Sequence, residues 1–342
     1  ESPLTTTNPM MQDLYDVVKT HSDALAIPSL AKPAPTSFLT GKEVVRSSEL
    51  DPSPFQLEIP QLEQVVVNAR ASQFVELYRK EDLNLDLNMS FVGRRRLELQ
   101  HFIALDKVPT NSNLSIAHKP VVESLLEVAE DVTIAAYLES TNAQSADTRR
   151  EVVIFERQMQ FIVVFRGSTP EQHGKSPFFK KNKAVALETL DPSDDSECKI
   201  YSSMKESYLD LERRVFAALD NLMDQNPFCD IIFTGQSWGG AMATLGAYRY
   251  ALNRPVVRVS CHTFGSPKVG NRGFRQHTNS LPNLKVMRVE YASDTKCFVP
   301  SDGDHVGHSI VLGKDGQTNA LTAVAYKFDD DHDARKHHHT KP

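Results

Sequence analysis

A serine flanked by two glycines, placed between a predicted strand and a predicted helix, constrains the fold of this chain more than any other feature. Residues 231–234 are apolar and partly β-branched, which is typical of a buried strand. The sequence Gly-Gln-Ser-Trp-Gly follows at 235–239, and residues 241–252 then carry a helical pattern. A sharp turn between strand and helix holds a serine strained, with its hydroxyl exposed above the sheet. A side chain at either glycine would collide with the neighbouring strand and helix, so we interpret Ser237 as a nucleophile rather than part of a glycine-rich helix start.

Strand and helix patterns alternate on both sides of this turn. Their alternation predicts an α/β fold with a mainly parallel central sheet and helices on both faces, preceded by an N-terminal extension. Gln158 is predicted to form a short turn between two consecutive strands. The predicted elements are, in order, a helix at 119–137, strands at 151–155 and 159–165, a helix at 203–223, the strand and helix around Ser237, and strands at 256–264 and 284–291.

Composition and periodicity divide the chain into four regions. The first is rich in Pro, Ser and Thr, and the second contains a predicted helix at 61–78 and a predicted strand at 83–91. The last is charged and contains three consecutive histidines, which could chelate a metal adventitiously, but no functional metal site is expected. The regions are an extended or partly ordered arm at 1–60, an extension packing on the core at 61–115, the α/β domain at 116–327 and a mobile tail at 328–342.

Charge and cysteine usage exclude some classes of partner. The net charge of −6 argues against nucleic acid, and no apolar stretch approaches the roughly 20 residues of a membrane-spanning helix. The four cysteines form no metal-type pair; Cys261 is predicted to be a buried thiol, and any pairing of the others stays open. The first residue is Glu, and Asn-x-Ser sequences occur at Asn88 and Asn113. A secretory route is therefore favoured, but the compartment stays open.

A serine becomes a useful nucleophile only when an imidazole takes its proton and a carboxylate holds that imidazole. Asp294 follows the predicted strand 284–291 and so lies at the edge of a parallel sheet where sites are built. Glu290 lies inside that strand and is interpreted as structural. His305 and His308 are both candidates for the base.

Four blocks make the chain resemble the class 3 (fungal-type) lipase family of the α/β-hydrolase fold, over roughly residues 121–312. Their order and spacing together are more specific than any one motif. The blocks are Ile-Val-Val-Phe-Arg-Gly-Ser at 162–168, Thr-Gly-Gln-Ser-Trp-Gly-Gly-Ala at 234–241, Thr-Phe-Gly-Ser-Pro-Lys-Val-Gly-Asn at 263–271, and Asp294 followed by Val299-Pro300 and His-Val-Gly at 305–307.

The resemblance implies catalytic roles for five residues and a reaction that needs no cofactor. His308 remains the alternative base, and the segment from Asp294 to His305 is short for the fungal members. Trp238 stands where the family usually has Leu, and its bulk is expected to reshape the acyl entrance. The implied roles are nucleophile for Ser237, orienting acid for Asp294, base for His305, and oxyanion donors for Ser168 and the backbone N–H of Trp238.

The resemblance also implies a lid at 169–198 and a lipid substrate. Two phenylalanines stand beside three lysines at 178–183, which suits a loop that touches a lipid–water interface; an irregular surface loop is the alternative. The leading hypothesis is a serine hydrolase that cleaves acylglycerols. An esterase, or a phospholipase or galactolipase, is the alternative, and a non-catalytic regulatory protein is a lesser one. Such a lipase could be secreted or act at lipid droplets or organelles.

Overall fold

The computed structural model describes residues 59–77, 97–98, 132–140, 150–168, 186–190, 197–291, 294, 297, 299–314 and 321–328. The predicted strand at 83–91 and nearly all of the arm lie outside the described residues, as do the tail from 329 onward and most of the expected lid.

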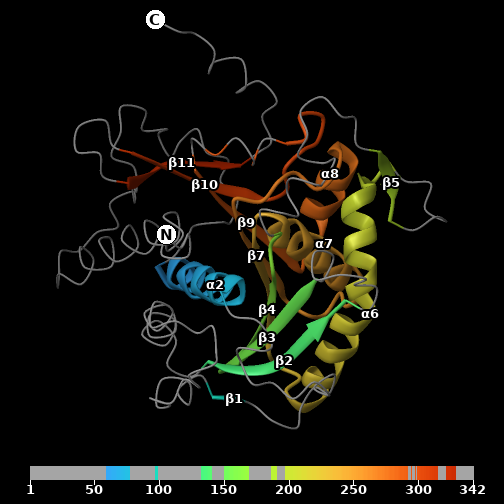
Figure 1. Ribbon diagram of the computed structural model, residues 1–342, viewed down its shortest axis with the longest axis vertical. Helices are drawn as coiled ribbons and strands as arrows, with labels where there is room; N and C mark the ends of the chain where they lie inside the picture. Colours follow the sequence, from blue (N-terminus) through green and yellow to red (C-terminus); the bar gives the residue numbers. More distant parts are fainter. Residues whose placement is uncertain are drawn as a thin grey trace, which may run out of the picture.

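A twisted sheet runs through the described part of the chain, in the strand order β1-β2-β3-β4-β7-β8-β9-β10-β11 (Figure 1). The five strands from β4 to β10 in this order pair in parallel, and the strands at both edges pair antiparallel. The bounds are β1 Leu97–Glu98, β2 Thr133–Glu139, β3 Glu151–Arg157, β4 Gln160–Phe165, β7 Asp230–Gln236, β8 Val259–Phe264, β9 Leu284–Tyr291, β10 His308–Lys314 and β11 Leu321–Phe328.

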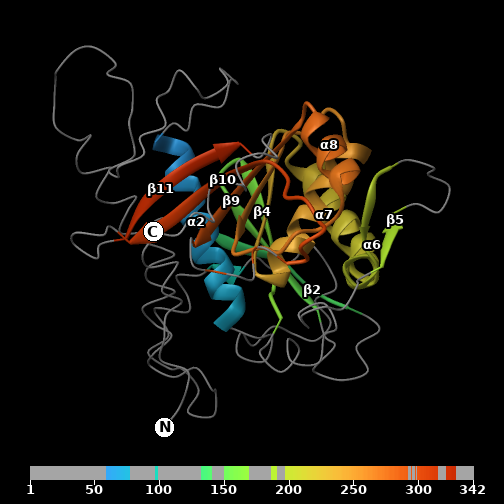
Figure 2. The same ribbon diagram turned by 90° about the horizontal axis from the view of Figure 1, so that it is seen from above.

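Helices cover both faces of this sheet. The helix α2 (Ile59–Leu77) lies on one face, against β4, β7 and β8. The other face carries α6 (Ser202–Gln225), α7 (Trp238–Asn253) and α8 (Arg272–Ser280), as Figure 2 shows. A small two-stranded sheet of β5 (Leu187–Thr189) and β6 (Lys199–Tyr201) lies beside α6. None of the described helices is both long and apolar enough to cross a membrane.

Burial explains why these residues form these elements. Residues 161–165 of β4 are at most 1% exposed, as expected for a parallel strand covered on both faces. The helix α6 buries one stripe and exposes the rest, whereas the Ala- and Gly-rich α7 is buried along nearly its whole length between the sheet and α6. The prediction of an α/β fold with a mainly parallel sheet and helices on both faces is confirmed.

Two sequence predictions of secondary structure are wrong. Residues 133–139 form strand β2 rather than the end of a helix. Residues 134–138 are all buried, and a run that is apolar at every position cannot be distinguished from a buried helix by its period. The strand predicted from 256 begins at Val259, because Val256 is 92% exposed in the turn after α7.

All four cysteines are buried free thiols, so no disulfide contributes to this fold. The prediction of a buried thiol at Cys261 is confirmed, and burial raises its pKa to about 12. Such a thiol stays protonated and unreactive at neutral pH.

Candidate active site

Ser237 lies in the turn that joins β7 to α7, and its backbone is strained. Its φ of 52° and ψ of −121° are unusual for a residue with a side chain, and such a conformation costs on the order of 1–3 kcal/mol. The backbone N–H of Ser237 donates to Phe264 O at 2.8 Å, and its carbonyl accepts from Gly240 N at 3.0 Å. The turn is thereby fixed to β8 on one side and to the first turn of α7 on the other.

The flanking glycines are required by contacts between backbones. A Cβ added to Gly239 would lie 2.2 Å from the carbonyl oxygen of Phe165, and one added to Gly235 would lie 2.5 Å from the backbone of Gly239. Real Cβ atoms do not approach other atoms so closely. The predicted collision with the neighbouring strand and helix is confirmed, and it makes this turn a nucleophile elbow in form.

The segment after β4, residues 166–168, lies beside this elbow because β4 and β7 pair in parallel with Phe165 opposite Gly235. We call it the oxyanion loop, since it contains the predicted donor Ser168, which is partly buried. Arg166 pairs with the Glu151 carboxylate, in keeping with its interpretation as a structural ion-pair partner.

Trp238 is the first residue of α7. Its indole is 3% exposed and packs in the hydrophobic core, where its bulk is accommodated. The backbone N–H groups in the first turn of a helix point out of its N-terminal end, so α7 directs N–H groups toward the space beside Ser237.

Asp294 follows β9 at the carboxyl edge of the sheet, as predicted, and is partly buried near the thiol of Cys297. The pKa of that thiol is raised by burial first, and then by the carboxylates of Glu290 and Asp294. Asp294 therefore lies close to the segment that contacts His305.

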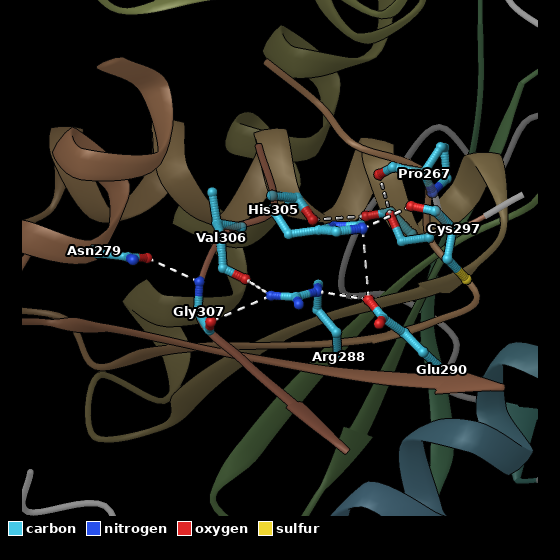
Figure 3. A network of polar contacts seen from close by, with 11 residues as sticks. Pro267, Asn279, Arg288, Glu290, Cys297, His305, Val306 and Gly307 are labelled. Carbon is cyan, nitrogen blue, oxygen red and sulfur yellow. Dashed lines mark hydrogen bonds and ion pairs between the residues drawn. The ribbon is translucent and has the colours of Figure 1, made fainter. Parts of the chain in front are cut away.

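The Nε2 atom of His305 lies beside a backbone carbonyl oxygen. This atom lies 2.7 Å from Cys297 O and 3.7 Å from Glu290 Oε1 (Figure 3). A carbonyl oxygen can only accept, so Nε2 carries a proton and a neutral ring keeps its lone pair on Nδ1. A triad base has the opposite tautomer, with Nε2 accepting from the serine.

Arg288 holds this histidine segment. It donates to Glu290 Oε1 at 2.8 Å and to the carbonyl oxygens of Val306 and Gly307, and it is 2% exposed (Figure 3). The interpretation of Glu290 as structural is in keeping with this pair. The spacing of Arg288 and Glu290, two positions apart on one face of β9, was the sequence signal for it.

His308, the alternative base, is buried and begins β10. Its backbone pairs with Met287 of β9 and Phe328 of β11. The structure thus brings Ser237 and residues 166–168 together, whereas the contacts of His305 and His308 described above attach both histidines to the segment after β9 and to the sheet.

Comparison with known proteins identifies this arrangement. Residues 162–302 match the family model described as Lipase (class 3). Over these residues, about two fifths of its length, the chain is similar to class 3 lipases. The matched residues include the oxyanion loop, the elbow and Asp294; His305 and His308 follow them.

Plant proteins are similar to this chain in sequence, and a fungal protein is similar to it in fold. It is 34% identical over 121 residues to phospholipase A1-IIdelta of Arabidopsis thaliana, covering 30% of this chain and 29% of that one. It is 25% identical over 249 residues to triacylglycerol lipase OBL1 of Arabidopsis thaliana, covering 61% and 48%. Its fold is similar to that of lipase II from Rhizopus niveus, with a TM-score of 0.53 and 18% identity over 80% and 89% of the two chains. The chain thus spans about half or less of the length of the two Arabidopsis proteins.

One contact of the oxyanion loop was not predicted from the sequence. Glu76 of α2 accepts a hydrogen bond from Gly167 N at 2.5 Å. The sequence signal for it was a polar residue at every fourth position, namely Asn68, Ser72 and Glu76, which places the three side chains along one side of the helix.

Proposed function

We propose that this chain is a serine carboxylic-ester hydrolase that cleaves acylglycerols through an acyl-enzyme on Ser237. The observation that carries the proposal is the strained turn at Ser237, which only glycine neighbours permit, next to the exit of β4. A protein keeps such strain where a side chain must be presented for chemistry.

In the proposed reaction, the Ser237 hydroxyl attacks the ester carbonyl while a histidine takes its proton and then returns it to the leaving alcohol. Asp294 orients that imidazole. The Ser168 hydroxyl and the Trp238 backbone N–H donate to the oxygen of the tetrahedral intermediate, and water then releases the fatty acid. These steps require no metal or organic cofactor.

His305 is the proposed base, and its observed contacts define what it must do. Its Nε2–H has to leave Cys297 O before that nitrogen can accept the serine proton. Variants His305→Gln and His308→Gln, together with a variant lacking the histidines at 332 and 337–339, would identify the base by the rate at which a fluorophosphonate labels Ser237. Loss of labelling in His305→Gln alone supports His305. Labelling that survives in His305→Gln and fails in His308→Gln assigns the base to His308, and labelling that fails only in the third variant places the base among the four histidines that it lacks.

The substrate class is tested with wild type and Ser237→Ala on emulsified tributyrin, a long-chain triacylglycerol and phosphatidylcholine vesicles. We expect Ser237→Ala to lose at least about 10⁴-fold in rate on every substrate that the wild type cleaves. Equal activity of the two proteins would contradict the proposal. A folded wild type that cleaves no ester would instead favour a regulatory role.

A phospholipid is the second candidate substrate. The relative named phospholipase A1-IIdelta is 34% identical over its short match, whereas triacylglycerol lipase OBL1 is 25% identical over a longer one. A wild type that prefers phosphatidylcholine to triacylglycerol would select this alternative.

We also propose that residues 169–198 form a lid that contacts a lipid–water interface, because Phe178 and Phe179 stand beside Lys180, Lys181 and Lys183. The rate on tributyrin should then rise sharply above its solubility limit. Serine at both phenylalanine positions should remove this rise while hydrolysis of a dissolved short ester persists. A rise that survives both replacements would contradict the lid.

A further inference from the structure

The helix α2 crosses the strands of the candidate site, and three of its polar side chains contact, in turn, β8, β7 and the loop that follows β4. Asn68 Nδ2 lies 2.6 Å from Nδ1 of His262 on β8, and Ser72 Oγ lies 3.2 Å from Thr234 Oγ1 on β7. Asn68 and Ser72 are at most 1% exposed. Glu76, one further turn along, reaches past the end of β4 to the oxyanion loop.

Glu76 contacts the oxyanion loop at two points. Its side-chain Oε1 accepts from Gly167 N at 2.5 Å, and its backbone carbonyl accepts from Arg166 Nη1 at 2.9 Å. Arg166 in turn pairs with the Glu151 carboxylate, and its backbone N–H donates to Glu151 O at 3.0 Å. The last turn of α2 is therefore attached to both residues that precede Ser168.

The oxyanion loop also presses against the elbow. A Cβ added to Gly239 would lie 2.9 Å from the carbonyl carbon of Arg166 and 3.0 Å from Gly167 N, and one added to Gly167 would lie 2.9 Å from Gln236 O. The peptide between residues 166 and 167 is thus held between α2 on one side and the turn of Ser237 on the other. Because peptide units are planar, fixing Gly167 N also fixes Gly167 Cα, and the position of Ser168 then depends only on the backbone dihedral angles of Gly167.

We propose that Glu76 is a positioning residue for ester hydrolysis, which holds Gly167 so that Ser168 donates to the oxygen of the tetrahedral intermediate. This inference rests on the proposed function. Glu76 does not touch the substrate in this arrangement; it acts through the loop. An oxyanion donor is effective only when it is already aimed at the developing charge, and a misplacement of about 1 Å can cost about 100-fold in rate.

The test compares kcat and KM for a dissolved short-chain ester, p-nitrophenyl butyrate, with enzyme concentration set by fluorophosphonate titration of Ser237. We expect Glu76→Ala to lower kcat by about 10- to 100-fold, with KM changed less than about threefold. Glu76→Gln keeps an oxygen that can accept from Gly167 N, so its kcat should stay within about threefold of wild type. If Glu76→Ala does not fold, Glu76→Asp replaces it, because its shorter carboxylate cannot reach Gly167.

A double-mutant cycle with Ser168→Ala separates positioning from a general loss of structure. If Glu76 acts through Ser168, Glu76→Ala should lower kcat by no more than about threefold once the Ser168 hydroxyl is absent. The matched control is Ser72→Ala, one turn earlier on α2, which removes a buried contact with Thr234 and should leave kcat unchanged.

Three outcomes would overturn this inference alone, given a wild type that hydrolyses the ester and a Ser237→Ala variant that does not. These are an unchanged kcat in Glu76→Ala, an equal loss with and without the Ser168 hydroxyl, and a loss in Ser72→Ala as large as that in Glu76→Ala. A wild type without ester hydrolysis, or an active Ser237→Ala, overturns the proposed function together with the inference.

Discussion

The two sides of the candidate site are held in different ways. On the elbow side, backbones touch backbones: Gly239 lies against Phe165 and residues 166–167, and Ser237 is bonded to β8. On the histidine side, buried polar side chains hold loop carbonyls: Arg288 holds residues 306 and 307, and His305 holds Cys297 O. Backbone packing permits one arrangement, whereas a hydrogen-bonded side chain can exchange partners. The proposed nucleophile is therefore fixed in place, while the proposed base has to move.

The largest effect should come from Gly239→Ala, which tests the backbone packing directly. Its Cβ would lie 2.2 Å from Phe165 O, so either α7 must move away from the sheet or β4 must move and disturb its parallel pairing with β7. We expect a loss of at least about 4 kcal/mol in the free energy of unfolding, or no folding at all. Urea unfolding followed by circular dichroism measures this.

Gly246→Ala is the matched control on the same helix. Its Cβ would meet only ring atoms of Phe233 at 3.0 Å and of Phe165 at 3.3 Å, and alanine favours a helix by about 1 kcal/mol over glycine. The loss in the free energy of unfolding should be much smaller for Gly246→Ala than for Gly239→Ala. Similar losses in the two variants would show that the contact with Phe165 O is not what restricts Gly239.

The next largest effect on stability should come from Arg288→Met, which tests the buried polar contacts on the histidine side. It leaves Glu290 buried without its partner, and breaking such a pair costs about 3–5 kcal/mol. The double variant Arg288→Met/Glu290→Leu removes both charges and should recover part of that loss. Unfolding in urea gives both values. A double variant less stable than Arg288→Met would contradict this account of the pair.

Sequence reasoning succeeded on the elbow side because its constraints are local. A strand, five residues and a helix contain the whole conformational requirement, so Gly235, Ser237 and Gly239 could be interpreted together. The mainly parallel sheet could be predicted for the same reason, because each strand and helix pattern is local in the sequence. By contrast, the contact between Glu76 and Gly167 joins residues 91 positions apart. The tautomer of His305 depends on Cys297 O, a backbone atom that no side-chain pattern reveals.

Two titratable groups, His262 beside α2 and Glu76 within it, should make the free energy of unfolding depend on pH in opposite directions. The effect of His262 should be the larger of the two. Burial lowers its pKa from 6.5 to about 4, and Asn68 Nδ2, which can only donate, faces its Nδ1. Between these values the unfolded chain binds more protons, so His262 should contribute a stability loss of about 3 kcal/mol as pH falls from 6.5 to 4. The stability difference between wild type and His262→Gln, from urea unfolding, should shrink over that window. A constant difference would contradict this.

Glu76 should act with the opposite sign and a smaller size. Burial raises its pKa from 4.5 to about 6, although Arg166 and the Gly167 N–H oppose the shift. The folded chain therefore binds more protons between these values, and Glu76 should contribute a stability loss of about 2 kcal/mol as pH rises from 4.5 to 6. Relative to Glu76→Gln, the wild type should lose stability over this window. A gain would show that the ion pair with Arg166 outweighs burial.

The smallest effect on stability should come from a substitution at the amino ends of β7 and β8, at the edge of the sheet opposite the candidate site. Arg258 and Asp230 pair at 2.7 Å just before β8 and at the start of β7, with side chains 80% and 39% exposed. Exposed pairs contribute at most about 1 kcal/mol, because water screens them and holding two side chains costs entropy. Arg258→Ala should therefore shift unfolding by less than about 1 kcal/mol and leave kcat for p-nitrophenyl butyrate unchanged. The turn of Ser237 follows β7 and is hydrogen-bonded to β8. A fall in kcat without a fall in stability would therefore mean that strain passes along these strands to the elbow. The elbow would then be less firmly fixed by its backbone contacts than the structure indicates.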